Sequence, residues 1–238
     1  MCGRYSLHSN PDVIALMFGL SQIPAQQPRY NIAPASQVLI VRQNEAAMVR
    51  WGLVPRWAKD PSIGAKMNNA RAETVAEKPS FREAYRKRRC LIPANGFYEW
   101  KLENGLKQPY YIHPSGGALF AFAGLWEQWR DLQTCAIITT AANEKMAAVH
   151  ERMPVIVSPA EYSLWLAGED VALRPCPESA IDIRRVSRAV NNARNDVPEL
   201  CSIPNPTRAA RADLPRAAVL DIMPALHKGT VGKPGPGG

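Results

Sequence analysis

Residues 97–113 read FYEWKLENGLKQPYYIH, a sequence typical of a β-hairpin. Two runs rich in aromatic and apolar residues, Phe97–Glu103 and Pro109–His113, flank the pair Asn104-Gly105. Asn-Gly is the dipeptide that most favours the tight turn of a two-residue hairpin. Because side chains alternate along a strand, Phe97 and Glu99 share one face of the predicted hairpin, and Tyr98 and Trp100 share the other.

Further strands are predicted on both sides of this hairpin, with short helices between them. Apolar, β-prone runs predict strands at Gln37–Arg42, Ala47–Leu53, Ala118–Trp126 and Thr134–Ala141. A short helix is predicted over 11–18, capped by Asn10, with Pro11 as its first residue and Gly19 as its stop. Two more are predicted over 80–88, with Ser80 and Glu83 as a capping box, and from 158 to about 167. Strands joined by short turns outnumber helices, so we expect an α+β fold. The expected form is a single compact domain with a curved, largely antiparallel sheet flanked by short helices.

The composition changes after about residue 203. Pro204-Asn205-Pro206 begins a stretch rich in Pro, Ala and Arg that ends in GKPGPGG. We therefore expect a folded domain over residues 1–203 and a C-terminal tail over 204–238, with the last residues disordered.

Charge and cysteine usage limit the functional classes. The chain has 238 residues and a formal net charge of +8, which favours polyanionic partners, nucleic acid first. No apolar run is long enough for a membrane span, and no signal peptide is visible. The number of cysteines is odd, five, and none has CxxC spacing, so we expect free thiols and no metal site. These features predict a cytoplasmic protein in a reducing compartment.

Cys2 directly follows the initiator methionine. If Met1 is removed, Cys2 carries a free amine and a thiol on adjacent carbons. Their ordinary pKa values are about 8 and 8.5, so both groups have usable nucleophilic fractions near neutrality. The amine can condense with an aldehyde, and the thiol can then close a five-membered thiazolidine. The alternative is a small residue in a frayed terminus, and position alone favours that alternative.

Four further polar residues are candidates for chemistry or binding. Asn69, in the dense polar run 68–74, can orient a substrate oxygen, and Arg71 in the same run can hold a phosphate. Glu99 on an apolar face would have a raised pKa and could transfer protons near neutrality, whereas on a solvent face it would not. His150 lies in a polar cluster ahead of Pro154 and can act as a general acid or base. A structural turn or a surface histidine would explain the same residues.

A stretch of aromatic and basic residues follows the second predicted strand. Residues 51–59 read WGLVPRWAK, in which Trp57 stands between Arg56 and Lys59. Rings next to cations suit unpaired nucleic acid, because bases stack on the rings and phosphates meet the cations. No helix-turn-helix, zinc-finger or RNP signature is present.

Taken together, these segments resemble the SOS-response-associated peptidase (SRAP) family, also called abasic-site processing proteins. The resemblance preserves segment order from residue 2 to about 203. It rests on the segments CGRY (2–5), YNIAP (30–34), WGLVP (51–55), NARAET (69–74), RCLIP (89–93), GFYEW (96–100), ITTAA (138–142) and HERMP (150–154), with a late block at Val186-Ser187 and Val190-Asn191-Asn192.

The resemblance implies an activity, a fold and a set of site residues. Family members protect abasic sites in single-stranded DNA by a covalent cross-link through a mature N-terminal cysteine, which here is Cys2. Glu99 would transfer protons, His150 would assist sugar opening and cross-link reversal, and Asn69 would position the terminus and the lesion. The implied DNA contacts are Arg4, Trp57 and Arg71, and the implied fold is a compact α+β domain with a basic cleft. The family name also reflects self-removal of Met1.

Two other functions remain open at this point. One is a thiol peptidase or amidohydrolase with an N-terminal nucleophile, in which Cys2 attacks an amide and Asn69 contributes to an oxyanion site. The other is a non-catalytic single-strand binder, whose affinity would depend strongly on salt and not on Cys2. For the cross-linking function the expected partner is single-stranded DNA containing abasic sites. No cofactor is expected, and a monomer suits a protein that sits on one lesion.

Overall fold

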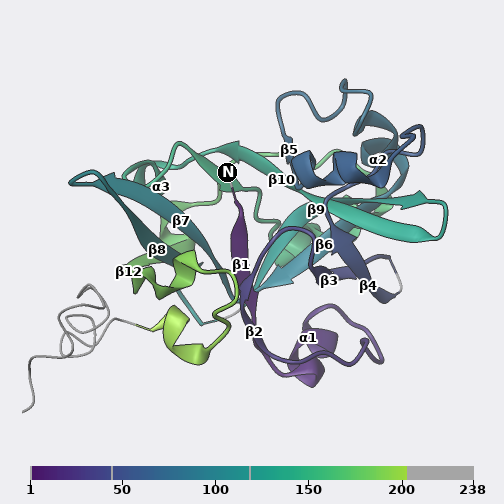
Figure 1. The fold of residues 1–238 in the computed structure, drawn as a ribbon. Helices are drawn as coiled ribbons and strands as arrows, with labels where there is room; N and C mark the ends of the chain where they lie inside the picture. The colour runs from purple at the N-terminus through teal and green to yellow at the C-terminus, as the bar shows by residue number, and fades with distance from the viewer. Residues whose placement is uncertain (1, 44, 118, 203–238) are drawn as a thin grey trace, which may run out of the picture. The chain divides into compact units, whose positions relative to one another are not determined.

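A computed structural model describes residues 2–43, 45–117 and 119–202. The strands divide between two sheets rather than forming the one curved sheet expected from the sequence (Figure 1). The first sheet has five strands in the order β12-β8-β7-β1-β2, and every pairing in it is antiparallel. Its strands are β1 (Arg4–Leu7), β2 (Arg29–Ile32), β7 (Gly96–Glu103), β8 (Leu106–Pro114) and β12 (Ile181–Arg185).

The second sheet has seven strands and closes on itself. Its path β11-β10-β4-β3-β6-β9 returns to β10, because β9 also pairs with β10, and β5 joins β10 outside the path. Closing a sheet into a ring removes its open edges. The strands are β3 (Gln37–Val41), β4 (Ala46–Trp51), β5 (Asn69–Arg71), β6 (Arg89–Ala94), β9 (Phe120–Trp129), β10 (Leu132–Ala141) and β11 (Arg152–Pro154). Here β10 runs parallel to β4 and β5, so the sheet is largely, not wholly, antiparallel.

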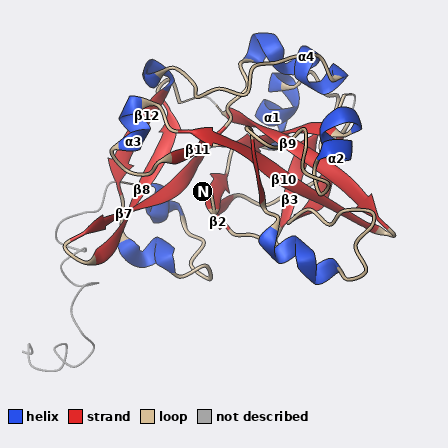
Figure 2. Ribbon diagram, turned by 90° about the horizontal axis from the view of Figure 1, so that it is seen from above, coloured by secondary structure: helices blue, strands red, loops and turns tan. Residues whose placement is uncertain are grey.

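The helices are short and lie around the strands (Figure 2). The α-helices are α1 (Pro11–Met17), α2 (Arg82–Lys87), α3 (Glu144–Ala147) and α4 (Tyr162–Ala167). Short 3-10 helices cover Pro61–Lys66, Pro159–Glu161, Glu178–Ala180, Arg188–Asn191 and Pro198–Cys201. The sequence-based expectation of an α+β domain rich in strands is therefore confirmed.

The hairpin predicted from residues 97–113 is present as β7 and β8. Its turn residues Asn104 and Gly105 both have positive φ, 49° and 77°, as the tight turn requires. The register pairs Glu103 with Leu106 next to the turn and Phe97 with Ile112 at the other end. The Asn-Gly pair thus predicted the turn correctly, and β8 begins earlier than expected, at Leu106 rather than Pro109.

Two helix predictions have different outcomes. For α1, the Asn10 side chain caps the helix by accepting from the backbone N–H of Asp12 at 2.8 Å, as predicted. For α2, the predicted capping box at Ser80 is wrong: the helix begins at Arg82, and its N-cap Phe81 makes no side-chain cap. Instead Phe81 is buried, and its backbone N–H donates to the carbonyl of Lys78, so packing and a preceding turn fix the helix start.

The main core joins the two sheets. Aromatic side chains of the first sheet, Tyr5 and Phe97, meet Trp51 and Phe122 of the second. Tyr5 lies 5.3 Å from Trp51 and 6.1 Å from Phe122 between ring centroids, both edge-on. This packing fixes β1, and therefore the residues before it, against the closed sheet.

No helix among the described residues is long and apolar enough to cross a membrane. The C-terminal tail predicted for 204–238 lies outside the described residues.

Candidate functional site

Cys2 lies two residues before β1 and is buried beside the end of this strand. β1 pairs with β7 through Arg4 and Tyr98, so Cys2 lies just beyond the last paired residue. Cys2 is 0% exposed, and its thiol faces the carbonyl of Arg4 at 4.0 Å. The alternative of a frayed terminus is therefore wrong for this residue.

Burial also changes the chemistry expected of the thiol. It raises the pKa of the Cys2 thiol well above its ordinary value, and the neighbouring Glu99 carboxylate adds to the rise. The expectation of a usable thiolate fraction near neutrality is thus not met with Met1 in place. Attack by this sulfur requires a base that removes its proton.

Asn69 fixes the backbone of Cys2. It begins β5, which runs parallel to β10 and pairs Asn69 with Ile137. Its side-chain amide donates to the carbonyl oxygen of Cys2 at 2.8 Å. Its Oδ1 is buried and accepts no hydrogen bond from the described residues, which leaves an acceptor at the site. Arg71 follows two residues later on the same face of the strand and is exposed.

Glu99 lies on β7 next to this terminus and is only 3% exposed. Burial raises the pKa of Glu99, while interactions with the amino terminus and with His150 act in the opposite direction. Of the two faces that the sequence left open for Glu99, the structure has the buried one. A carboxyl group with a raised pKa can both donate and accept a proton nearer neutrality than an ordinary one.

His150 approaches Glu99 from the segment before β11. Its Nε2 lies 4.0 Å from Oε2 of Glu99. Its Nδ1 lies 2.9 Å from the backbone nitrogen of Arg152 and 3.2 Å from the carbonyl oxygen of the same residue, and these contacts orient the ring so that Nε2 faces Glu99. The two side chains thus form an acid–base pair.

An ion pair that sequence reasoning missed holds the His150 segment in place. Arg152 donates to both carboxylate oxygens of Glu73, at 2.5 and 3.0 Å, and to the carbonyl of Thr139 at 2.7 Å. The interaction with Arg152 lowers the pKa of Glu73. Both residues lie in segments that carry the family resemblance, but their pairing is not visible from either segment alone.

A pocket of about 470 Å³ opens beside the acid–base pair. It is lined by Arg4, Glu99, Trp100, Lys107, His150 and Asn191. Both faces of β7 contribute, because β1 stops pairing at Tyr98 and leaves the edge of β7 open from Glu99 onward. Three of these residues, Trp100, Lys107 and Asn191, were not among the predicted site residues.

Arg4 and Trp100 are held in the pocket wall by the 3-10 turn at 188–191. Arg4 donates to the carbonyl of Val190 at 2.9 Å and to the side chain of Asn31 at 2.8 Å. The indole N–H of Trp100 donates to Oδ1 of Asn191 at 2.7 Å. The late sequence block around Val190-Asn191 therefore closes one side of the pocket.

Trp57 does not line this pocket. It lies in the loop after β4, is 59% exposed, and its indole N–H approaches the carbonyl of Pro79 at 3.4 Å. The structure thus brings together Cys2, Asn69, Glu99, His150 and Arg4, and leaves Trp57 apart on an exposed surface.

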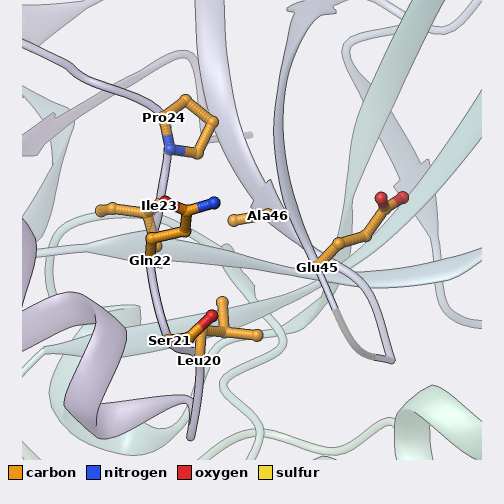
Figure 3. Close-up of a pocket in the computed structure, with 7 residues that line it drawn as sticks. All are labelled: Leu20, Ser21, Gln22, Ile23, Pro24, Glu45 and Ala46. Atoms are coloured by element: carbon orange, nitrogen blue, oxygen red, sulfur yellow. The ribbon is translucent and has the colours of Figure 1, made fainter.

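Two other pockets lack this combination of groups. One of about 480 Å³ lies between residues 20–24 and the start of β4, and its single charged side chain is Glu45 (Figure 3). Glu45 pairs with Arg42 at 2.8 Å. A larger one, about 1000 Å³, is lined mainly by small and apolar residues around Phe120, Ile156 and Tyr162. Neither joins a nucleophile to an acid–base pair.

Known proteins are similar to this chain in sequence and in fold. The model of the SOS response associated peptidase (SRAP) family matches residues 1–193. The chain is 42% identical to the abasic site processing protein YoqW of Bacillus subtilis over 84% of this chain and 98% of the relative. It is 35% identical to the abasic site processing protein HMCES of Gallus gallus over 75% of this chain and 66% of the relative. A crystal structure of a protein from Bacteroides thetaiotaomicron superposes with a TM-score of 0.78 at 26% identity, covering 86% of this chain and 100% of that one. The order of the sequence segments, the fold and these matches agree, and the chain belongs to the SOS response associated peptidase (SRAP) family.

Proposed function

We propose that this protein recognises abasic sites in single-stranded DNA and joins them covalently to Cys2, which shields the lesion during the response to DNA damage. The observation that carries the proposal is the acid–base pair Glu99 and His150 beside a cysteine whose backbone is fixed by Asn69. The relatives named abasic site processing proteins support the same assignment.

The first step is loss of Met1. Hydrolysis of the Met1–Cys2 peptide bond consumes one water molecule and creates the α-amine of Cys2. Amine and thiol then stand on adjacent carbons, as the cross-link requires. We propose that the protein carries out this step itself, with Glu99 accepting a proton from the attacking group.

The second step is condensation with the open sugar. An abasic deoxyribose exists mainly as a closed ring, and His150 assists its opening to the aldehyde by moving a proton between the ring oxygen and the hydroxyl. The Cys2 amine attacks the aldehyde carbon and forms a carbinolamine. Glu99 in its protonated form donates to the departing hydroxyl, which leaves as water, and a Schiff base results.

The third step closes the thiazolidine. The Glu99 carboxylate left by the second step accepts the thiol proton, and the sulfur attacks the carbon of the protonated Schiff base. The nitrogen takes the electron pair of the C=N bond and keeps the proton it already carries. The net reaction joins one aldehyde to one aminothiol with the loss of one water. Burial raises the pKa of the Cys2 thiol while Met1 is in place, so a base beside the sulfur favours its attack.

DNA is held by the basic and aromatic residues around the pocket. Arg4 lines the pocket, and Arg71 lies on the same strand face as Asn69, so both suit phosphates next to the lesion. Trp57 is exposed farther along the surface, where it suits an unstacked base of the same strand. Only unpaired DNA can present both a free sugar and unstacked bases.

A peptidase that acts on other proteins is less well supported. In that function Asn69 would contribute to an oxyanion site, but its amide donates to the carbonyl of Cys2 itself. An amide that is engaged with the protein's own backbone is not aimed at the carbonyl of a separate peptide substrate.

We further propose that residues 1–203 act as one catalytic domain and that 204–238 form an appended tail. The match to the family model over residues 1–193 supports this limit. A monomer in the cytoplasm suits the proposed activity, since one pocket serves one lesion.

The test is cross-linking of the full chain to single-stranded DNA with one abasic site, followed on denaturing gels. We expect a heat-stable adduct with the parent protein and with Cys176→Ala, a matched loss of a buried thiol outside the site. Cys2→Ala keeps an N-terminal amine but lacks sulfur, so it should give only an adduct that borohydride must trap. A heat-stable adduct formed by Cys2→Ala without borohydride would exclude the thiazolidine.

A further inference from the structure

The β7–β8 hairpin continues past the pocket as a two-stranded arm. On one side the pairing with β1 ends at Tyr98, and on the other the pairing with β12 ends at Tyr110. Residues 101–108 therefore pair only with each other among the described strands, and the arm projects away from the other strands (Figure 1). Leu102, Leu106 and Lys107 of this arm are exposed, whereas Gln108 at its base is buried.

The two faces of the arm differ in chemistry. The register pairs Leu102 with Lys107 and Glu103 with Leu106, so each pair shares a face. The first face also carries Trp100, two residues before Leu102, and we call Trp100, Leu102 and Lys107 the pocket-side face. Leu102 is 70% exposed, and Lys107 is exposed and lines the pocket.

The opposite face does not suit a polyanion in the same way. It carries Leu106, which is 55% exposed, and the carboxylate of Glu103. Glu103 accepts from the hydroxyl of Tyr110 at 2.6 Å and pairs with Arg185 at 3.6 Å. The carboxylate of Glu103 offsets the positive charges of Lys101 and Arg185 near this face, whereas the pocket-side face carries Lys107 with no carboxylate beside it among the described residues of the arm.

We propose that the pocket-side face binds the nucleotide next to the abasic site, with Leu102 against its base and Lys107 at its phosphate. This inference rests on the proposed function, because it takes DNA as the occupant of the pocket. Residues two apart on a strand are separated by roughly 7 Å, twice the rise of about 3.4 Å between stacked bases, which leaves room for one unstacked nucleotide. Trp100, held by Asn191, forms the inner end of this path.

Equilibrium binding tests the arm without depending on the cross-link. The probe is a fluorescent single-stranded oligonucleotide with a tetrahydrofuran abasic analogue, which has no aldehyde and cannot react with Cys2. We compare Leu102→Ser with Leu106→Ser and Lys107→Ala with Lys101→Ala, since each control removes a matched side chain from the opposite face. Thermal unfolding midpoints equal to the parent's establish that all four variants are folded.

The expected effects are confined to the pocket-side face. Leu102→Ser should raise the dissociation constant about fivefold, while Leu106→Ser leaves it unchanged. Lys107→Ala should reduce the slope of log K against log salt by about 0.7, the value for one phosphate contact on a single strand, and Lys101→Ala should not. Removing the nucleotides on one side of the analogue should abolish the difference between the parent and Leu102→Ser.

Equal effects on the two faces, or none on either, would overturn the role of the arm while leaving the cross-linking proposal intact. Failure of the parent to bind the oligonucleotide at all would overturn both.

Discussion

At the scale of single residues, burial disfavours the ionised form of the Glu99 side chain. Its carboxyl group is nearly fully buried, and burial raises its pKa above the value in the unfolded chain. A raised carboxyl pKa means that the folded state binds the proton more tightly. The stability gained from the neutral carboxyl is complete below the ordinary carboxyl pKa and is lost as the pH rises through the folded pKa. Burial of the Glu99 carboxyl group therefore lowers the stability of the folded protein as the pH rises, and this is the group that the proposed reaction uses for proton transfer.

Replacing Glu99 by Gln should separate stability from activity. Gln has no charge to bury. The stability of Glu99→Gln relative to the parent, measured as the difference in their free energies of unfolding, should therefore increase from about pH 5 to about pH 8. Urea denaturation at the two pH values measures this difference.

The same variant should cross-link abasic DNA more slowly by about 10²-fold or more, since it can neither donate to the departing hydroxyl nor accept the thiol proton. Glu103→Gln, a change on the same strand outside the pocket, serves as the control and should keep the parent rate. A cross-linking rate that Glu99→Gln leaves intact would remove Glu99 from the mechanism.

At the scale of elements, an ion triad with a buried pair at its centre joins the C-terminal end of α2, β9 and the loop after β4. Glu127 on β9 accepts from Arg88 at 2.7 Å and from Arg56 at 2.9 Å. The side chains of Glu127 and Arg88 are only 5% and 8% exposed, whereas that of Arg56 is 62% exposed. The loop that Arg56 anchors also carries Trp57, so the triad fixes the position of the loop from which this proposed DNA contact extends.

Loss of the shared carboxylate should therefore cost more stability than loss of the exposed arginine. Glu127→Ala leaves Arg88 buried without its counter-ion and should lower the free energy of unfolding by about 3–5 kcal/mol. Arg56→Ala removes an exposed partner and should cost about 1 kcal/mol or less. Urea denaturation of both variants measures the difference, and equal losses would show that the triad does not act through the buried pair.

At the scale of the whole molecule, local patterns predicted the elements but not how they assemble. The Asn104-Gly105 turn and the apolar runs of β3, β4 and β10 are properties of short segments, so they could be recognised from the sequence. The return of β9 to β10 and the parallel pairing of β10 with β4 depend on contacts between distant segments. No local pattern encodes them, which is why one sheet was expected where two exist.

The same distinction holds for the site. Asn69, Glu99 and His150 stood out as polar residues within apolar or motif-like segments, and they converge on Cys2. The burial of Cys2 could not be predicted, because termini are usually exposed and only the packing of β1 shows otherwise. The bond from Trp100 to Asn191 spans 91 residues and was equally hidden.

The central claim is that the amine and the thiol of Cys2 together capture an aldehyde in DNA. Intact mass spectrometry of the full chain, incubated with a single-stranded oligonucleotide bearing one abasic site, tests it most directly. The predicted species has the mass of the chain without Met1 plus the oligonucleotide minus one water, and its mass does not change on treatment with borohydride. A Schiff base has the same mass but gains two hydrogen atoms from borohydride. An adduct that gains them, an adduct that retains Met1, or no adduct at all would contradict the account.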